Sequence, residues 1–589
     1  MLSANALRVL EARYLLRDAE RRVIETPSQL FERVARAVAE AETAFGSPEG
    51  ASWWADRFHA LLTSGDFLPN SPTLMNAGTA LGQLSACFVL PVEDTMESIF
   101  EALKQMALVQ RTGGGTGFSF SALRPRGDVV ASTGGEASGP VSFMKIFDCA
   151  TDNIKQGGKR RGANMGALRV EHPDILEFIG AKLEGNALAN FNTSVSVTDA
   201  FLAAAARGAD YELIHPRTGR PAGRLSAARV FRAICEAAWQ RGDPGLLFRD
   251  AIGRANPVPH LGAIETTNPC GEVPLLPHES CNLGSVNLAR LVRDAHGTPA
   301  FDWERLAALV HDAVRFLDDV IEVNRYPFAE IAQTTRRTRK IGLGVMGFAD
   351  ALIRLGIGYD SDQAVQFAER LMRALADAAA RASVALAERR GAFPAWRGSV
   401  YESRRLEIRN ATRTAIAPTG TIGIIAGTSA SIEPLFALAY RRAGVLGGET
   451  LEEVSPLFAE HLGRHGLDAH RVLAAVRERG RLAEVPGVPD ELKRLFVTAL
   501  DIPAERHLAI QAAFQRHVDN SVSKTINLPH DATPEDVARA YRRAWELGLK
   551  GITVYRYGSK PGQVLQLGAT EEPHHYDHAS RCDPDECRL

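Results

Sequence analysis

Several properties that would assign a chain to a broad class are missing from this one. Lysine plus arginine number 68 against 70 for aspartate plus glutamate, and the formal net charge is −2. Such a balance gives no electrostatic basis for binding nucleic acid or a membrane surface. No apolar run approaches the length of a membrane span, and residues 1–20 lack the pattern of a signal peptide. We therefore expect a soluble, cytoplasmic protein with neither nucleic acid nor membrane as a partner.

Cysteine is also scarce. The 589 residues contain seven, an odd number: Cys87, Cys149, Cys235, Cys270, Cys281, Cys582 and Cys587. So few thiols in so long a chain exclude a disulfide scaffold and fit reduced thiols with a few redox-active members. No CxxC pair accompanies Cys270, which disfavours a zinc site, and no metal ligand is assigned.

The order of patterns along the chain predicts three parts. Residues 1–80 are expected to be helical, because apolar positions recur at helical spacing and Thr26-Pro27 marks a helix start. Residues 81–565 alternate short apolar strands with helices, which is typical of parallel α/β architecture. Residues 566–589 are polar and without periodicity, which predicts a flexible tail. Strands are predicted at 85–91, 192–197, 340–347 and 414–417, and helices at 94–110, 141–154, 226–240, 303–323 and 361–390.

The residue types best suited to catalysis are concentrated in Asn268-Pro269-Cys270-Gly271-Glu272. Pro269 pushes Asn268 toward extended backbone, in which side chains at i, i+2 and i+4 share a face. We therefore predict that an amide, a thiol and a carboxyl group (Asn268, Cys270 and Glu272) point the same way, while Gly271 leaves room for a ligand. Such a set suits sulfur chemistry with the carboxylate as general base. From spacing alone, a buried structural cysteine in a Pro/Gly turn explains the pattern equally well.

Three loops are candidate ligand sites. The glycine run at 112–119 offers unobstructed backbone N–H groups, but it has neither a Walker ending nor dinucleotide spacing, so a turn is the better interpretation. Residues 157–164 place Lys159, Arg160 and Arg161 among glycines, which fits a phosphate-responsive loop or a solvated basic turn. The turn at 418–423 follows a predicted strand and can offer hydroxyls and free amides to phosphate oxygens.

The tail ends in a cysteine pair, Cys582 and Cys587. A thiol pair of this kind fits either a thiol–disulfide shuttle or metal chelation. The acidic residues between the thiols and the lack of a second CxxC pair favour the shuttle.

Taken together, these motifs resemble those of ribonucleotide reductase catalytic subunits, in particular the class II, adenosylcobalamin-dependent kind, over nearly the whole chain. They occur in the family's order: Asn-Ser-Pro-Thr at 70–73, Ser-Ala-Cys at 85–87, Gly-Gly-Lys-Arg-Arg-Gly-Ala-Asn-Met at 157–165, Asn-Pro-Cys-Gly-Glu at 268–272, Ser-Cys-Asn-Leu-Gly at 280–284, Pro-Thr-Gly-Thr at 418–421 and the terminal Cys-x4-Cys. The resemblance implies a ten-stranded α/β barrel of two parallel five-stranded halves. A central finger loop inside it would have 268–272 at its tip.

The resemblance also implies a role for most of the cysteines. Cys270 would hold a transient thiyl radical, formed with adenosylcobalamin (a cobalt cofactor), that abstracts the ribose 3′-hydrogen. Glu272 would take the 3′-hydroxyl proton, and Asn268 would hydrogen-bond the substrate. Cys87 and Cys281 match the family's reducing pair, which becomes a disulfide. Cys582 and Cys587 match the tail pair that reduces it again and is recharged by a thioredoxin-like partner. Cys149 and Cys235 match nothing catalytic and are expected to be structural.

The resemblance also implies which residues contact nucleotides. The ribonucleotide substrate is expected to meet Ser71, Ala86, Gly115, Pro269, Gly271, Pro418, Thr419, Gly420, Thr421 and Ile422, the last five as a diphosphate cradle. Loops at 132–139 and 157–165, including Lys159, Arg160 and Arg161, match those that couple an effector (a deoxynucleotide or ATP) at a homodimer interface to base choice. No additional N-terminal ATP-binding domain is expected, which implies regulation of specificity without an overall activity switch.

The class within the family is inferred from what is missing. Class I enzymes carry the radical from a second subunit through adjacent tyrosines near the C-terminus, and this chain has Tyr555-Arg556-Tyr557 instead. Glu272 and the tail argue against a glycyl-radical enzyme. The Asp-x-His-x-x-Gly motif of other B12 enzymes is absent, since its nearest approach, at 468–473, lacks the glycine. Two alternatives remain: a class I large subunit, and a non-radical thiol-redox protein that binds nucleotides.

Overall fold

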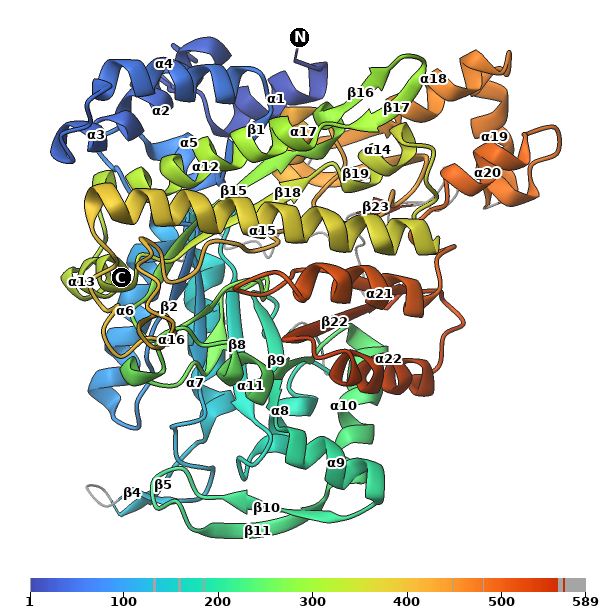
Figure 1. Cartoon of the computed structure of the whole chain (residues 1–589). Coiled ribbons are helices and arrows are strands. Elements are labelled where there is room, and N and C mark those ends of the chain that lie inside the picture. The colour runs from blue at the N-terminus through green and yellow to red at the C-terminus, as the bar shows by residue number, and fades with distance from the viewer. Residues whose placement is uncertain are drawn as a thin grey trace.

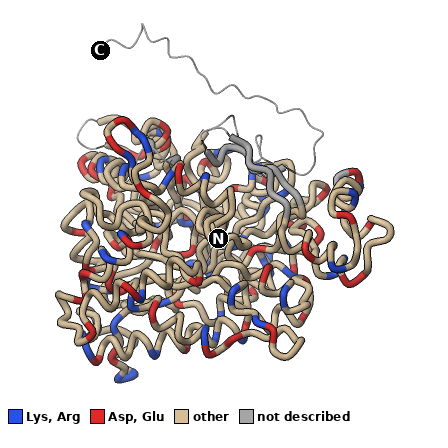
Figure 2. The backbone as a smooth tube through the Cα atoms, turned by 90° about the horizontal axis from the view of Figure 1, so that it is seen from above, with Lys and Arg blue, Asp and Glu red and all other residues tan. Residues whose placement is uncertain are grey.

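The computed structural model describes residues 2–130, 134–156, 160–183, 185, 187–446, 449–479, 481–559 and 565–566. Within these ranges, no helix has both the length and the apolar character that crossing a membrane requires. Acidic and basic residues are interspersed throughout the view in Figure 2. This mixture agrees with the small net charge of the sequence.

Four helices form the N-terminal region: α1 (Ala4–Arg13), α2 (Pro27–Ala39), α3 (Ala41–Ala44) and α4 (Gly50–Thr63). Thr26 is the N-cap of α2, where its side chain and that of Gln29 form a reciprocal capping box, which confirms the predicted helix start. These helices lie above the barrel in Figure 1 and share one hydrophobic core with two long barrel helices, α12 (Trp303–Val323) and α15 (Asp362–Arg390).

The first half of the barrel is a run of five parallel strands. In order across the sheet they are β2 (Cys87–Val89), β3 (Gly115–Ser119), β8 (Asn164–Arg169), β9 (Phe191–Val197) and β12 (Gly245–Phe248). Apolar residues of these strands and of the helices outside them form a second large core.

The second half closes the barrel. Strand β15 (Ser280–Asn287) pairs in parallel with β18 (Ile341–Met346), and β21 (Thr525–Leu528) with β22 (Gly551–Arg556). Residues 414–416 lie between these pairs, with isolated parallel bridges from Thr414 to Leu343 and from Ile416 to Val522. The two halves meet antiparallel at β2/β15 and β12/β22. The expected barrel of two five-stranded halves is confirmed, with the predicted strand at 414–417 present only as these bridges.

Helices cover the outside of the barrel. The predicted helices correspond to α6 (Met96–Arg111), α7 (Pro140–Asn153), α10 (Ala227–Arg241), α12 and α15. Two further helices, α21 (Ala504–Gln515) and α22 (Pro534–Glu546), flank the last strands. Three more pack into a separate apolar cluster, seen at the upper right of Figure 1: α18 (Pro456–Arg464), α19 (Ala469–Arg479) and α20 (Asp490–Leu495).

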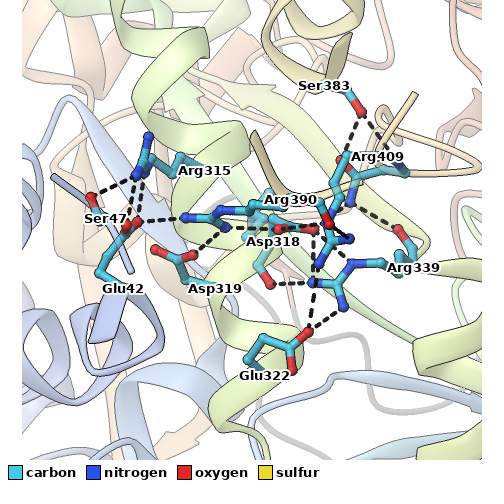
Figure 3. A network of polar contacts seen from close by, with 12 residues as sticks. Glu42, Ser47, Arg315, Asp318, Asp319, Glu322, Arg339, Ser383, Arg390 and Arg409 are labelled. Atoms are coloured by element: carbon cyan, nitrogen blue, oxygen red, sulfur yellow. Dashed lines mark hydrogen bonds and ion pairs between the residues drawn. The ribbon is translucent and has the colours of Figure 1, made fainter. Parts of the chain in front are cut away.

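A buried ionic network joins the N-terminal helices to the barrel (Figure 3). Its members are four arginines and four carboxylates: Arg315, Arg339, Arg390, Arg409, Glu42, Asp318, Asp319 and Glu322. Arg390 at the end of α15 bridges Glu42 of α3 (2.7 Å) to Asp318 (2.9 Å) and Asp319 (2.7 Å) of α12. The network therefore fixes α3 against two barrel helices.

Candidate active site

The segment 268–272 is the turn of a hairpin between β13 (Thr266–Thr267) and β14 (Pro274–Leu275). The N–H of Gly271 donates to the carbonyl of Asn268 (3.1 Å), and Gly271 has a φ of +82°. The predicted extended conformation is therefore wrong. Proline also fits the second position of a tight turn, and the antiparallel pairing of the flanking strands requires the chain to reverse here.

The hairpin lies against the strands of the barrel. A Cβ built on Gly117 of β3 would lie 1.8 Å from the carbonyl oxygen of Thr267, and one on Gly115 would lie 2.9 Å from Pro269. Asn192 of β9 donates to the carbonyl of Pro269 (2.8 Å), and the Ser521 N–H donates to the carbonyl of Glu272 (2.8 Å). The glycine run at 112–119 is thus largely strand β3, and its glycines admit the hairpin.

Next to the turn lies a cavity of about 340 Å³. Most of the predicted catalytic and substrate-binding residues line it: Ser71, Ala86, Cys87, Gly115, Asn268, Pro269, Cys270, Glu272, Pro418, Thr419, Gly420, Thr421 and Ile422. Cys281 and Gly271 are not among its lining residues. Residues from five separate parts of the chain therefore meet at one place.

Glu272 is the ionisable centre of this cavity. It is 2% exposed, and its Oε2 has no hydrogen-bond partner among the described residues. Burial raises the pKa of Glu272 to about 7, against the opposing effect of a hydrogen bond from the Asn268 side chain. A carboxyl group with a pKa near neutrality and a vacant oxygen can accept a proton from a ligand hydroxyl.

Cys87 and Cys281 lie directly opposite each other on the antiparallel strands β2 and β15. Both thiols are reduced in this structure. Directly paired residues of antiparallel strands have Cα atoms about 4.5–5.5 Å apart, a separation that a disulfide can bridge. Burial raises the pKa of both thiols, and at Cys87 the nearby Glu272 raises it further. The two thiols can therefore serve as a two-electron reductant.

A second cavity, of about 250 Å³, lies on another side of the hairpin. Pro269, Cys270 and Pro418 line both cavities, so the two cavities meet at the turn. Polar side chains from several strands line the second one: Asn192, Thr193, Ser194, Asp243, Glu433, Ser523, Lys524, Thr525 and Thr553. Its hydrogen-bonding lining and its access to Cys270 suit a polar cofactor placed next to that thiol.

Lys524 holds one wall of the second cavity in place. It donates to Glu433 (2.5 Å), to Nδ1 of His507 (3.0 Å) and to its neighbour's carbonyl at Thr525 (3.1 Å). Burial lowers the pKa of Lys524, while Glu433 opposes this change. With its three N–H groups used, Lys524 fixes the carboxylate of Glu433 toward the cavity.

Sequence reasoning missed several residues that support the site. Tyr14 of α1 hydrogen-bonds Ser71 (2.7 Å), which ties the N-terminal helices to the substrate cavity. A fully buried ion pair, Lys340 with Glu279 (2.7 Å), lies beside Cys281. Lys340 could have been noticed in the sequence, because it is a charged residue directly before the apolar strand at 341–346.

Of the basic loop, the structure describes only part. Arg160 and Arg161 belong to a short strand, β7, paired with β6 (Lys155–Gln156), and Lys159, Cys582 and Cys587 lie outside the described residues. Cys235 is buried in α10, as a structural cysteine would be, but Cys149 is exposed on α7 and is not part of a core.

Comparison with known proteins agrees with this architecture. Residues 85–408 and 404–555 match the family model described as the ribonucleotide reductase barrel domain, and residues 1–82 match the ribonucleotide reductase all-alpha domain. The chain belongs to the ribonucleotide reductase family.

Its relatives narrow the assignment within that family. The chain is 54% identical over 569 residues to a vitamin B12-dependent ribonucleoside-diphosphate reductase of Mycobacterium tuberculosis, covering 96% of this chain and 80% of the relative. It is 50% identical over 625 residues to the protein of the same name from Thermoplasma acidophilum, covering 97% and 81%. The class Id ribonucleotide reductase alpha subunit of Actinobacillus ureae has the same fold, with a TM-score of 0.77 at 24% identity over 95% of this chain and 97% of that one.

Proposed function

We propose that this protein reduces ribonucleoside diphosphates to 2′-deoxyribonucleotides with a thiyl radical on Cys270, formed with adenosylcobalamin. One observation supports it most directly. A single cavity is lined by Cys270, by buried Glu272, whose Oε2 has no partner among the described residues, and by Cys87, which is paired across the sheet with Cys281. A radical thiol, a base and a two-electron reductant are the three functions that replacing a ribose hydroxyl by hydrogen needs. The names and identities of the relatives support the same activity.

The ribonucleotide would be held between the hairpin and residues 418–422, where Pro418 and Thr419 turn into helix α17 (Gly420–Ala426). Gly420 has open space where a Cβ would be, so that a diphosphate can approach the backbone there. Thr419 has a φ of +50°, and its hydroxyl accepts from the Ser431 N–H (2.6 Å), which fixes the turn. The amide of Asn268 and the hydroxyl of Ser71 line the same cavity and would contact the sugar.

The residues then act in sequence on the ribose. The Cys270 thiyl takes the 3′-hydrogen atom, and Glu272 takes the 3′-hydroxyl proton. Cys87, which lines the cavity, gives its proton to the departing 2′-hydroxyl, which leaves as water. Cys281 gives its hydrogen atom to C2′ and joins Cys87 in a disulfide, whose excess electron passes to the 3′-ketone. Glu272 then returns the proton to the 3′ oxygen, and Cys270 returns the hydrogen atom to C3′. Burial keeps the thiol pKa of Cys87 raised, so that the proton is available at neutral pH.

The second cavity fits the cofactor's nucleoside end. Asn192, Asp243, Glu433 and Thr553 offer hydrogen bonds there, and the cavity reaches Cys270 without passing through the substrate cavity. When bound, adenosylcobalamin supplies the one-electron chemistry that oxidises a thiol to a thiyl. Among the cysteines that the structure describes, Cys270 is the one that lines both cavities, so its thiol can meet both the cofactor and the substrate.

Three partners complete the proposal. A thioredoxin-like reductant acts through Cys582 and Cys587, and a deoxynucleotide or ATP effector acts through the loops at 132–139 and 157–165.

A homodimer is supported by exposed apolar side chains on two neighbouring helices: Met96 (55% exposed) and Phe100 (46%) on α6, and Ile146 (39%) on α7. Apolar groups grouped in this way mark interaction surfaces.

Turnover of CDP by the purified chain alone tests the proposal. With adenosylcobalamin and dithiothreitol we expect dCDP, and without the cofactor none. Dependence on a separate metal-carrying subunit would instead favour the class I alternative. The tyrosines that such a relay would need, Tyr555 and Tyr557, are separated by Arg556 at the end of β22.

A further inference from the structure

We propose that the Cys87–Cys281 disulfide is reduced in one direction only: the incoming thiolate attacks Cys87, and Cys281 leaves as a thiolate stabilised by Lys340. The proposal rests on the function proposed above, which makes this disulfide a product of every turnover. It assigns Lys340 as a positioning residue for the return step.

Access to the two sulfur atoms differs. Cys87 lines the substrate cavity, whereas Cys281 is 0% exposed and is not among the lining residues. Both cysteines belong to one apolar cluster, but strand β18 also closes over Cys281, since a Cβ on Gly342 would lie 3.7 Å from its Sγ. A reductant that enters through the cavity therefore meets Cys87 first.

The strand register places Lys340 beside Cys281. In the parallel pair β15/β18, Asn282 is the partner of Ile341, so Cys281 and Lys340 are neighbours one step earlier in the ladder. Alternation along strands puts both side chains on the same face. The Lys340 ammonium is 0% exposed and donates to Glu279 (2.7 Å), which also accepts from the Thr338 hydroxyl (2.7 Å). Lys340 is thus held rigidly next to the thiol.

The charged neighbours of the two thiols differ, because the cation Lys340 acts on Cys281. Burial raises the pKa of both thiols, and Glu272 adds to this effect at both. At Cys281, Lys340 opposes it and has a larger effect on the pKa than either Glu279 or Glu272. A thiol with a lower pKa is the better leaving group in disulfide exchange. Electrostatics and access therefore select the same direction.

Reduction of the Cys87–Cys281 disulfide takes two exchange steps. A dithiol reductant attacks Cys87 Sγ as a thiolate, a bond forms between these two sulfur atoms, and the Cys87–Cys281 bond breaks with its electron pair on Cys281. The second thiol of the reductant then displaces Cys87 and leaves the reductant oxidised. Protons from the reductant restore both thiols.

Mapping of the mixed disulfide tests the direction. The full chain with Cys582→Ser and Cys587→Ser is oxidised, mixed with excess glutathione, quenched with iodoacetamide and analysed by peptide mass spectrometry. We expect glutathione on Cys87 and the carbamidomethyl group on Cys281. The reverse labelling would overturn the assignment. Failure of the Cys87–Cys281 disulfide to form at all would overturn the proposed function as well, so the two failures are distinguishable.

Substitution of Lys340 tests the electrostatic part. Lys340→Met should slow reduction of the oxidised protein by dithiothreitol about tenfold, the effect of roughly one pKa unit on the leaving thiolate. The control, Lys182→Met, removes a lysine that pairs with Asp243 (3.0 Å) and should leave the rate within about twofold. Should Lys340→Met not fold, Lys340→Met/Glu279→Gln removes both charges and should still slow the reaction. Rates equal to the parent protein in the folded variant would overturn the role of Lys340.

Discussion

Gly117 and Thr267 are in such close contact that no side chain fits between them. The Thr267 carbonyl oxygen lies 1.8 Å from the position that a Cβ on Gly117 would occupy. This contact sets how deeply the hairpin that carries Cys270 enters the barrel. A glycine in the middle of a strand usually weakens it, and here the lost strand stability is offset by the seating of the hairpin.

Gly117→Ala should therefore displace the hairpin. Because reacting groups moved by about 1 Å lose on the order of 10²-fold in rate, we expect that loss in kcat, with the barrel still folded. Gly253→Ala is the matched control, since nothing lies within 4 Å of its Cβ position in helix α11 (Arg249–Arg254). Circular dichroism and CDP turnover measure the two effects. Unchanged turnover in Gly117→Ala would show that the contact does not position Cys270.

Glu272→Gln should lower kcat about 10²–10⁴-fold, because the general base is lost. The wild-type rate should rise as the pH increases through about 7, where Glu272 ionises, and the variant should lack this rise. Initial rates of CDP reduction between pH 5.5 and 8.5, an interval of about 1.5 units on each side of that pKa, measure both effects. If Glu272→Gln kept this rise in rate with pH, the titration would belong to another group.

The same substitution should also change how the free energy of unfolding depends on pH. The wild-type rate rises with pH, whereas the wild-type stability should fall. The folded-state pKa of Glu272 is raised from 4.5 to about 7, so its stabilising contribution is complete below pH 4.5 and is lost as the pH rises through 7. Relative to Glu272→Gln, the wild type should lose about 3 kcal/mol of unfolding free energy over that interval. Urea denaturation of both proteins at the two ends of the interval tests the sign. A parallel pH dependence in both would contradict it.

Three cysteine substitutions should fail at two different steps. Cys270→Ser should abolish exchange of hydrogen between cofactor and solvent, because a serine O–H bond is too strong to yield a usable radical. Cys87→Ser and Cys281→Ser should retain that exchange but not complete reduction, and should release free base. Rapid-freeze EPR with product analysis separates these outcomes. Exchange that survived in Cys270→Ser and vanished in Cys281→Ser would reassign the radical cysteine.

Cys582→Ser/Cys587→Ser should abolish turnover with thioredoxin and retain much of it with dithiothreitol. The small dithiol can reach Cys87 through the cavity, whereas a protein cannot. Steady-state rates with each reductant give the comparison. Equal loss with both reductants would exclude a shuttle role for the tail.

From the network of Figure 3 we predict that replacing either of two adjacent aspartates, Asp318 or Asp319, lowers the free energy of unfolding by different amounts. Three arginines lower the pKa of Asp318, so Asp318→Asn leaves them partly uncompensated and should cost about 3–5 kcal/mol.

Burial and the neighbouring Glu42 raise the pKa of Asp319, whose Oδ2 has no partner among the described residues. Burial thus disfavours the charge of Asp319, and Asp319→Asn should cost less than about 1 kcal/mol. Its raised pKa also means that the wild type loses stability as the pH rises, a dependence that Asp319→Asn should remove. Denaturation with urea ranks the two variants, and equal costs would contradict this difference between the two aspartates.

The sequence by itself determined the elements and the chemistry. The helical spacing of apolar residues predicted residues 303–323 as a helix, and α12 has the same bounds. The order of short motifs indicated the family, because each motif requires particular residue types that local sequence records.

Only the tertiary structure decided how these parts meet. The turn at 268–272 depends on the pairing of Thr267 with Pro274, and a proline at this position is compatible with both extended and turning backbone. Cys87 faces Cys281, and Lys340 stands beside it, because of strand registers set by packing across the whole barrel. Such registers follow from the combined burial of many side chains, so no local pattern in the sequence contains them.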